Sequence, residues 1–241
     1  MVYLFPETPS GSVSLTDAPA TLAGPSGQAL GEDLGYGDID GDGYVDIAGA
    51  LGDGRVLVYT GPHLGPVTAA SAAATLVDTP RSVAVGDLDG DGSADVVVGY
   101  GDGVSTVATG IEVLFGPDLS SSAVIDADEL WANGGVEVGP PVDLDGNGTA
   151  ELFVASPTAT VGGVEWVGSV YLFHDPLGVS SFGEADTRWV LDEASQLSSL
   201  KVRPAGDVDG DGVDDVLVGA EQWQSSSGPV GAIWVISGST L

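Results

Sequence analysis

The sequence predicts an all-β protein, a β-propeller built of four-stranded antiparallel blades. One observation is the composition: glycine is frequent, with 38 residues among 241, and short runs of Val, Ile, Leu and aromatic residues alternate with glycine-rich turns. The other is repetition. A short acidic string begins at residues 38, 87, 143 and 207, so successive copies lie 49, 56 and 64 residues apart. Periods of this length are typical of solenoids and propellers.

Each acidic string lies within the same succession of short strands. In the second copy an apolar stretch precedes it, SVAVGD (82–87), and an apolar strand follows it, ADVVVGY (94–100). A third strand begins near a glycine in GIEVLFGPD (110–118), and a fourth run follows in SAVIDADEL (122–130). Glycine-rich turns between such runs favour antiparallel hairpins, so each repeat is predicted to form one four-stranded blade.

The first strand of each repeat is expected to lie innermost. Pro140, Pro141 and Pro204 fall in or near this strand. An innermost strand tolerates proline because one of its edges faces the central channel and needs no partner. The alternative is that the segments around these prolines are irregular loops.

The chain is predicted to be a single propeller-type domain over residues 1–241. It divides into a half-repeat at 1–24 and repeats at about 25–78, 79–130, 131–193 and 194–241. VYLF (2–5) corresponds to a third strand and residues 11–24 to a fourth, whereas the last repeat lacks its fourth strand. We expect the N-terminal segment to complete the last blade. The strand that corresponds to position three of a blade is then present at both ends of the chain, so one copy is surplus. Unpaired end strands offer a route to self-association.

The acidic string carries acids or an amide at its positions 1, 3, 5 and 9, and glycine at positions 4 and 6. Such a density of hard oxygen ligands favours Ca²⁺, which accepts roughly six to eight oxygens. The glycines allow the backbone to curl, and the carbonyl at position 7 offers another oxygen. We predict up to four Ca²⁺ ions. The predicted ligands are Asp38, Asp40, Asp42, Tyr44 and Asp46 (loop 1), Asp87, Asp89, Asp91, Ser93 and Asp95 (loop 2), Asp143, Asp145, Asn147, Thr149 and Glu151 (loop 3), and Asp207, Asp209, Asp211, Val213 and Asp215 (loop 4).

Two other interpretations of these loops are weaker. An EF-hand needs a glutamate at position 12, where this chain has Gly49, Val98, Val154 and Val218. Asp-Gly pairs also form plain hairpin turns. Four copies with the same ligand positions favour a cation over a plain turn, and loop 3 departs most because it has Asn147 and Glu151.

The repeats resemble the FG-GAP repeats of the integrin α-subunit propeller and of bacterial proteins built from the same unit. The resemblance rests on the DxDGDGxxD loops, while GYGD (35–38) and AGAL (48–51) stand where the family has its Phe-Gly and Gly-Ala-Pro signatures. It implies Ca²⁺ between the first two strands of a blade and a secreted or cell-surface location in a bacterium. Integrin-type propellers usually have seven blades, so a four-bladed ring, an open fragment and self-association all remain open here.

The charge balance restricts the partners. The chain has 36 acidic and 5 basic residues, a net charge of −31. Nucleic acid is excluded because phosphate binding needs Lys and Arg. The sequence contains no apolar run of about 20 residues, so membrane insertion is not predicted. Salt adaptation is an alternative explanation of the charge, but the acids are clustered. With no cysteine, a secreted chain would depend on metal instead of disulfides.

No catalytic constellation is visible, so the chain is predicted not to be an enzyme. His63 and His174 each follow a third strand, and the dense acid clusters are explained by calcium. The predicted function is an extracellular adhesion, protein-binding or structural module with a protein or glycan partner. The alternatives are a lectin-like carbohydrate-binding module, for which the five tryptophans are candidates, and an accessory domain of a secreted hydrolase.

Overall fold

The protein is described from a computed structural model. The structure describes residues 1–5, 10–76, 80–101, 110–127, 135–144, 147–159, 167–191, 199–225 and 228–240. Within these ranges it is all-β, and its helical elements are single 3₁₀ turns at Leu15–Asp17, Ala69–Ser71, Pro176–Gly178, Phe182–Glu184 and Gly238–Thr240. The all-β prediction is therefore confirmed.

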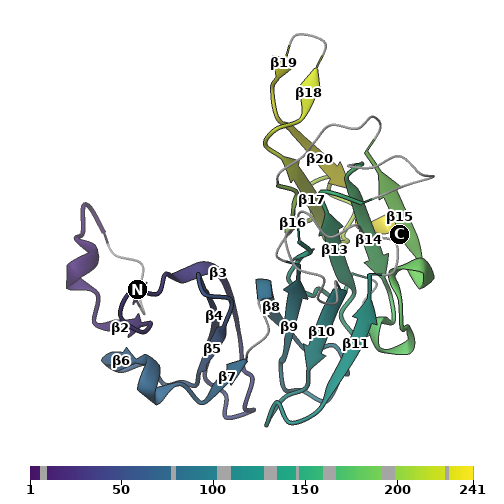
Figure 1. The fold of residues 1–241 in the computed structure, drawn as a ribbon. Helices are drawn as coiled ribbons and strands as arrows, with labels where there is room; N and C mark the ends of the chain where they lie inside the picture. The colour runs from purple at the N-terminus through teal and green to yellow at the C-terminus, as the bar shows by residue number, and fades with distance from the viewer. Residues whose placement is uncertain are drawn as a thin grey trace.

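Four antiparallel sheets follow one another along the chain (Figure 1). Sheet 1 has the order β3-β4-β5-β7, sheet 2 β8-β9-β10-β11, sheet 3 β12-β13-β14-β15 and sheet 4 β16-β17-β20. Sheet 1 contains β3 (Leu30–Gly37), β4 (Asp46–Leu51), β5 (Val56–Tyr59) and β7 (Ala74–Leu76); sheet 2 β8 (Pro80–Gly86), β9 (Asp95–Tyr100), β10 (Gly110–Leu114) and β11 (Ser122–Asp126); sheet 3 β12 (Glu137–Val138), β13 (Leu152–Ser156), β14 (Ser169–Phe173) and β15 (Thr187–Val190); sheet 4 β16 (Lys201–Gly206), β17 (Asp215–Ala220) and β20 (Ala232–Ile236).

Two smaller sheets complete the architecture. The N-terminal sheet has the order β1-β2-β6, from β1 (Val2–Leu4), β2 (Ala20–Ala23) and β6 (Pro66–Thr68), and β6 runs parallel to β2. A hairpin of β18 (Gln224–Ser225) and β19 (Gly228–Pro229) projects beyond sheet 4 (Figure 1). Neither β6 nor this hairpin is predicted from the sequence.

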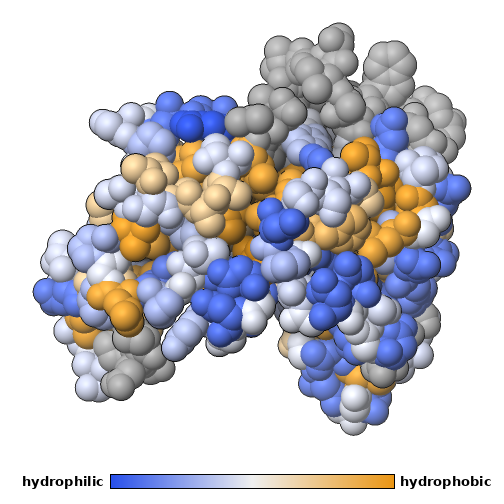
Figure 2. Space-filling view, turned by 90° about the horizontal axis from the view of Figure 1, so that it is seen from below, coloured by the Kyte–Doolittle hydropathy of each residue, from blue (hydrophilic) through white to orange (hydrophobic). Residues whose placement is uncertain are grey.

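The core lies between successive sheets because side chains of a strand point alternately to its two faces. In β9, Val96 and Val98 pack toward sheet 1 while Val97 packs toward sheet 3. One apolar cluster occupies each gap: between the N-terminal sheet and sheet 1, between sheets 1 and 2, between sheets 2 and 3, and between sheets 3 and 4. Hydrophobic residues also form a band across the face shown in Figure 2, with hydrophilic residues around it.

The first strands of the four sheets are neighbours, as the sequence predicts for innermost strands. β8 lies between β3 and β12, and β12 also contacts β16. A cluster of charges joins them: Arg203 of β16 lies 3.2 Å from Glu137 of β12 and 3.6 Å from Asp33 of β3, and Lys201 lies 2.6 Å from Glu137. The Asp33 carboxylate also accepts the N–H of Val83 on β8 at 3.0 Å.

Two expectations about strands need correction or refinement. Among the described residues, no N-terminal strand pairs with sheet 4; β1 and β2 pair with each other instead, so the expected completion of the last blade is not found. Pro140 and Pro141 lie beyond the short β12, whereas Pro204 lies within β16, where the register shifts between Pro204 and Gly206. The described strands form a succession of separate sheets and not a closed one.

Candidate metal centres

Each acidic loop joins the first strand of its sheet to the second, as predicted. The same two hydrogen bonds shape all four loops. The N–H at position 6, always glycine, donates to the carboxylate at position 1 over 2.9–3.0 Å. The N–H at position 7 donates to the side chain at position 5 over 2.7–2.9 Å. Gly43, Gly92, Gly148 and Gly212 all have φ between 87° and 93°, a conformation that glycine adopts without steric cost.

Position 9 connects the loop to the third strand. In loops 1, 2 and 4 this aspartate is fully buried. One carboxylate oxygen accepts the N–H of position 2 at 2.8 Å, and the other accepts the N–H of a glycine just after the third strand, at 2.7–3.1 Å. The aspartates are Asp46, Asp95 and Asp215, and their glycine partners are Gly61, Gly116 and Gly238.

These glycines are required because the third strand passes close to the loop. A Cβ on Gly116 would lie 2.8 Å from the carbonyl oxygens of Ala94 and Ile39, and one on Gly238 would lie 2.1 Å from the carbonyl oxygen of Asp214. The sequence contains a signal for them, the glycine that recurs after the third strand in YTGP, LFGP and ISGS. Our sequence interpretation did not assign it a role.

Loop 3 is built differently. Glu151 is fully buried, and its Oε2 accepts the N–H of Leu144 at 2.6 Å. Its Oε1 is buried and accepts no hydrogen bond. At the place of the third-strand glycine stands Asp175, and the Nδ1 of His174, the residue before it, lies 3.6 Å from Glu151 Oε1. A longer acid and Asp175 thus replace an aspartate and a glycine together, and the ring of His174 lies beside the longer acid.

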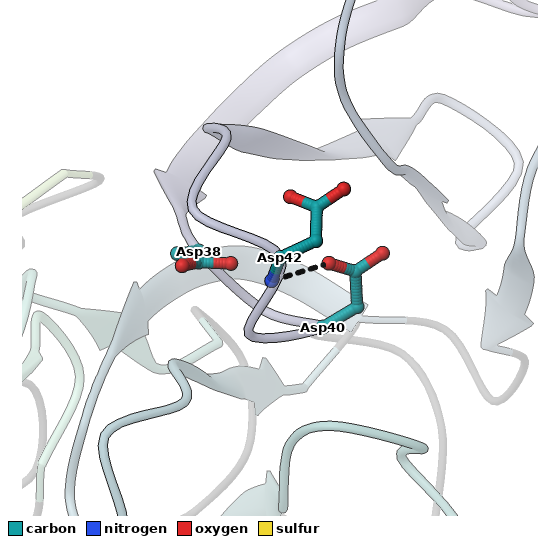
Figure 3. Close-up of side chains that lie close together, drawn as sticks. All are labelled: Asp38, Asp40 and Asp42. Carbon is teal, nitrogen blue, oxygen red and sulfur yellow. Dashed lines mark hydrogen bonds between the residues drawn. The ribbon is translucent and has the colours of Figure 1, made fainter.

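Among the described residues, carboxylates converge in three of the loops. Ligand oxygens of Asp38, Asp40 and Asp42 all lie within 4.8 Å of one another, and the same holds for Asp87, Asp89 and Asp95 and for Asp207, Asp209 and Asp215. Figure 3 shows the first set, in which the N–H of Asp42 donates to Asp40 Oδ1 at 3.2 Å. Sets of this kind fit a hard cation such as Ca²⁺.

The electrostatics of the loops favour the binding of a cation. Burial, with smaller contributions from the nearby charges of Asp89 and Asp87, raises the pKa of Asp95 to about 6. Desolvation and then the charge of Asp46 raise the pKa of Asp40. A bound cation would stabilise the ionised carboxylates that these neighbours disfavour.

The remaining predicted ligands lie outside these sets. Asp46, Asp143 and Glu151 accept the loop N–H groups described above. Asp91 and Asp211 each accept the position-7 N–H through the side chain but are not in the convergent sets. Asn147 Oδ1 accepts both the N–H and the hydroxyl of Thr149. Asp145 lies outside the described residues, and ligation by the carbonyls of Tyr44, Ser93, Thr149 and Val213 stays a prediction.

Comparison with known families matches two parts of the chain. The family model described as an FG-GAP-like repeat matches residues 38–98, which contain loops 1 and 2. The model described as an FG-GAP repeat matches residues 204–236, which contain loop 4. No curated protein matches the sequence. The matched segments hold the three loops with convergent carboxylates, and the chain accordingly contains FG-GAP repeats in these two segments.

Proposed function

We propose that this chain is a calcium-stabilised, propeller-type module of an extracellular or cell-surface bacterial protein, with a non-enzymatic role in adhesion, protein binding or structure. The observation that carries the proposal is the convergence of three carboxylates in each of loops 1, 2 and 4. FG-GAP repeats are typical of extracellular proteins. Among the described residues, no helix has the length and apolarity needed to cross a bilayer.

Calcium would add a further link between strands that hydrogen bonds and apolar packing already join. Each loop joins the first two strands, and position 9 reaches the third strand, so an ion bound in the loop would hold three strands of the sheet together. An ion that binds only the folded state raises stability with its concentration. The turns at the ends of such sheets would then form a fixed surface for a partner.

The proposal is tested by comparing Ca²⁺ with Mg²⁺. Terbium, a Ca²⁺ analogue that luminesces when bound, is added to the metal-free protein and displaced by either ion. We expect Ca²⁺ to displace it at much lower concentration than Mg²⁺, because Mg²⁺ retains its water shell and demands a stricter geometry. Failure of terbium to bind, or equal displacement by both ions, would contradict the proposal.

A carbohydrate-binding module is the second candidate, favoured by one hollow. Trp189 and Trp234, both half-buried, line a hollow of about 400 Å³ between sheets 3 and 4. Each ring is held by another aromatic: Trp189 stacks on Phe153 and Trp234 meets Trp223 edge to face. A glycan array probed in Ca²⁺ tests it, with Trp189→Ala as the variant. Hits that persist in the variant, or an array without hits, would exclude this site.

A further inference from the structure

Neighbouring acidic loops contact one another, and a hydrogen bond joins loop 1 to loop 2. The backbone carbonyl of Asp38, at position 1 of loop 1, accepts the N–H of Ala94, at position 8 of loop 2, over 2.7 Å. Beside this hydrogen bond, a Cβ on Gly41 of loop 1 would lie 3.4 Å from the hydroxyl oxygen of Ser93 in loop 2. The two loops therefore form one continuous structure and not two separate turns.

Asp38 serves both loops. Its carboxylate belongs to the convergent set of loop 1. Its Oδ2 accepts the N–H of Gly43, while its Oδ1 is buried and, among the described residues, accepts no hydrogen bond. A buried oxygen without a partner carries a desolvation cost that a cation in loop 1 would remove. An ion bound there would thus fix the residue whose carbonyl holds Ala94.

The contact reaches position 9 of loop 2. Ala94 directly precedes Asp95, which belongs to the convergent set of loop 2 and accepts the N–H of Gly116 at 3.0 Å. Gly116 in turn lies against loop 1, because a Cβ there would be 2.8 Å from the carbonyl oxygen of Ile39. Two routes therefore connect loop 1 with Asp95, one through the N–H of Ala94 and one through Gly116.

The contact becomes weaker along the chain. Between loops 2 and 3, a Cβ on Gly90 would lie 3.6 Å from Cγ2 of Thr149, which is ordinary van der Waals contact. In loop 4, position 8 is Asp214, which is exposed and, within the part of the chain that the structure describes, has no hydrogen bond to loop 3. Loop 4 thus provides a separate reference site within the same chain.

Two effects act between ions in neighbouring loops, and they have opposite signs. Each ion reduces the negative charge that attracts the next, which weakens binding at the second loop, but salt screens this effect between exposed groups. Ordering acts in the other direction, because a loop whose neighbour is already fixed loses less conformational freedom when it binds its own ion. At moderate salt we expect ordering to exceed the screened charge effect at loops 1 and 2, which share a hydrogen bond.

We propose that loops 1 and 2 bind their calcium ions cooperatively, with Asp38 as the residue that links them, while loop 4 binds independently of both. This inference rests on the proposed calcium function and adds how two of its sites are regulated. Ile39 and Ala94 also belong to the apolar cluster between sheets 1 and 2. Cooperative binding would therefore fix these two sheets against each other over a narrower range of calcium concentration than independent binding.

The test is a calcium titration of the intact chain at moderate salt, followed loop by loop through backbone amide signals in NMR spectra. The N–H groups of Gly92 and Gly212 report on loops 2 and 4, because each donates to the carboxylate at position 1 of its loop. Asp40→Ala disables loop 1, and we expect it to weaken calcium binding at loop 2 by about fivefold or more and to leave loop 4 unchanged. Asp209→Ala, the same change in loop 4, is the matched control and should leave loop 2 unchanged.

Reciprocity and hydrogen exchange separate the contact from the charge. Asp89→Ala disables loop 2, and it should weaken binding at loop 1, reported by the N–H of Gly43, by the same factor. In this variant calcium binds loop 1 without its neighbour. We expect the N–H of Ala94 to exchange more slowly once calcium is added, because its acceptor on Asp38 is then fixed.

Each outcome has a separate meaning. Loops 1 and 2 that both bind calcium, but independently, would overturn the coupling and leave the calcium function standing. Equal weakening of loop 2 by Asp40→Ala and Asp209→Ala, or unchanged exchange at Ala94, would overturn it too, because charge alone would then explain the effect. Loop signals of the native chain that do not respond to calcium would overturn the coupling together with the proposed function. If Asp40→Ala loses the native circular dichroism spectrum, Asp40→Asn replaces it, since it keeps an acceptor for the N–H of Asp42.

Discussion

Loops 1, 2 and 4 share one design, and loop 3 uses another. In the shared design, a buried aspartate at position 9 accepts N–H groups from both its own loop and a glycine after the third strand. In loop 3, Glu151 accepts the N–H of Leu144 and, among the described residues, no other N–H; Asp175 stands where the glycine would be, and His174 before it lies beside Glu151. The difference teaches that position 9 and the third-strand residue form a unit. A glycine after the third strand allows the backbone to approach the short aspartate at position 9. Where the residue after the third strand carries a side chain, position 9 is the longer glutamate.

The largest expected effect comes from removing the shared link. Asp95→Ala leaves the N–H groups of Leu88 and Gly116 without an acceptor, each at a cost of about 1–3 kcal/mol when buried. We expect a loss of about 3 kcal/mol or more in the free energy of unfolding, measured with urea, both in Ca²⁺ and in EGTA. Glu151→Ala, which frees one N–H, should cost less. Equal losses would show that the two designs do not differ in this link.

The next effect separates the role of a carboxylate as a calcium ligand from the role of position 9 in joining the loop to the third strand. Asp89→Ala removes one of the convergent carboxylates of loop 2. Within the loop, this carboxylate accepts the N–H of Asp91. We expect it to abolish most of the calcium stabilisation from loop 2, about 3 kcal/mol when Ca²⁺ is at 100 times its dissociation constant. In EGTA the cost should be small. The surface variant Asp118→Ala is the control. If both variants lower the melting temperature in Ca²⁺ by the same amount, loop 2 is only a turn and not a calcium site.

A smaller effect tests the third-strand residue directly. Gly116→Ala places a Cβ too close to two carbonyl oxygens, and such overpacking costs about 1–3 kcal/mol. His174→Ala, which removes the ring beside Glu151 next to the matching position of loop 3, should change the free energy of unfolding by less than about 1 kcal/mol. Thermal unfolding of both variants checks the pair. An unstable His174→Ala would show that loop 3 depends on the residue beside Glu151 as much as loop 2 depends on Gly116.

The smallest effect is on pH dependence. Asp95 has a pKa of about 6 in the folded protein, against an ordinary value of 3.8, so its ionisation costs stability in metal-free protein above about pH 6. That cost disappears as the pH falls, whereas Ca²⁺ needs the ionised form. Each pH unit below about 6 should weaken calcium binding at loop 2 about tenfold. Calorimetric titration at several pH values measures this, and a constant affinity down to pH 4 would contradict it.

The repeat pattern explains why so much of the fold is predictable. Val96 to Val98 lie in β9 as predicted, and each acidic loop joins a first strand to a second, because four copies of one local pattern constrain one another. What was missed depends on distant contacts. β6 joins β2 in parallel across more than 40 residues, and no local periodicity marks Pro66–Thr68 as a strand.

The sites show the same division between local and distant information. Spacing alone identified the acids at positions 1, 3, 5 and 9. The role of Gly61, Gly116 and Gly238 was not evident, because it appears only when the third strand folds back against the loop.

The most direct test of the account is a calcium titration of the metal-free protein at low ionic strength, followed by melting temperature and by heat of binding. We predict a melting temperature that rises steadily with Ca²⁺ concentration. We also predict up to four bound ions, with similar affinities at loops 1, 2 and 4 and a lower affinity at loop 3. A melting temperature that is the same in EGTA and in Ca²⁺, with no heat of binding, would contradict the claim that these loops are calcium sites.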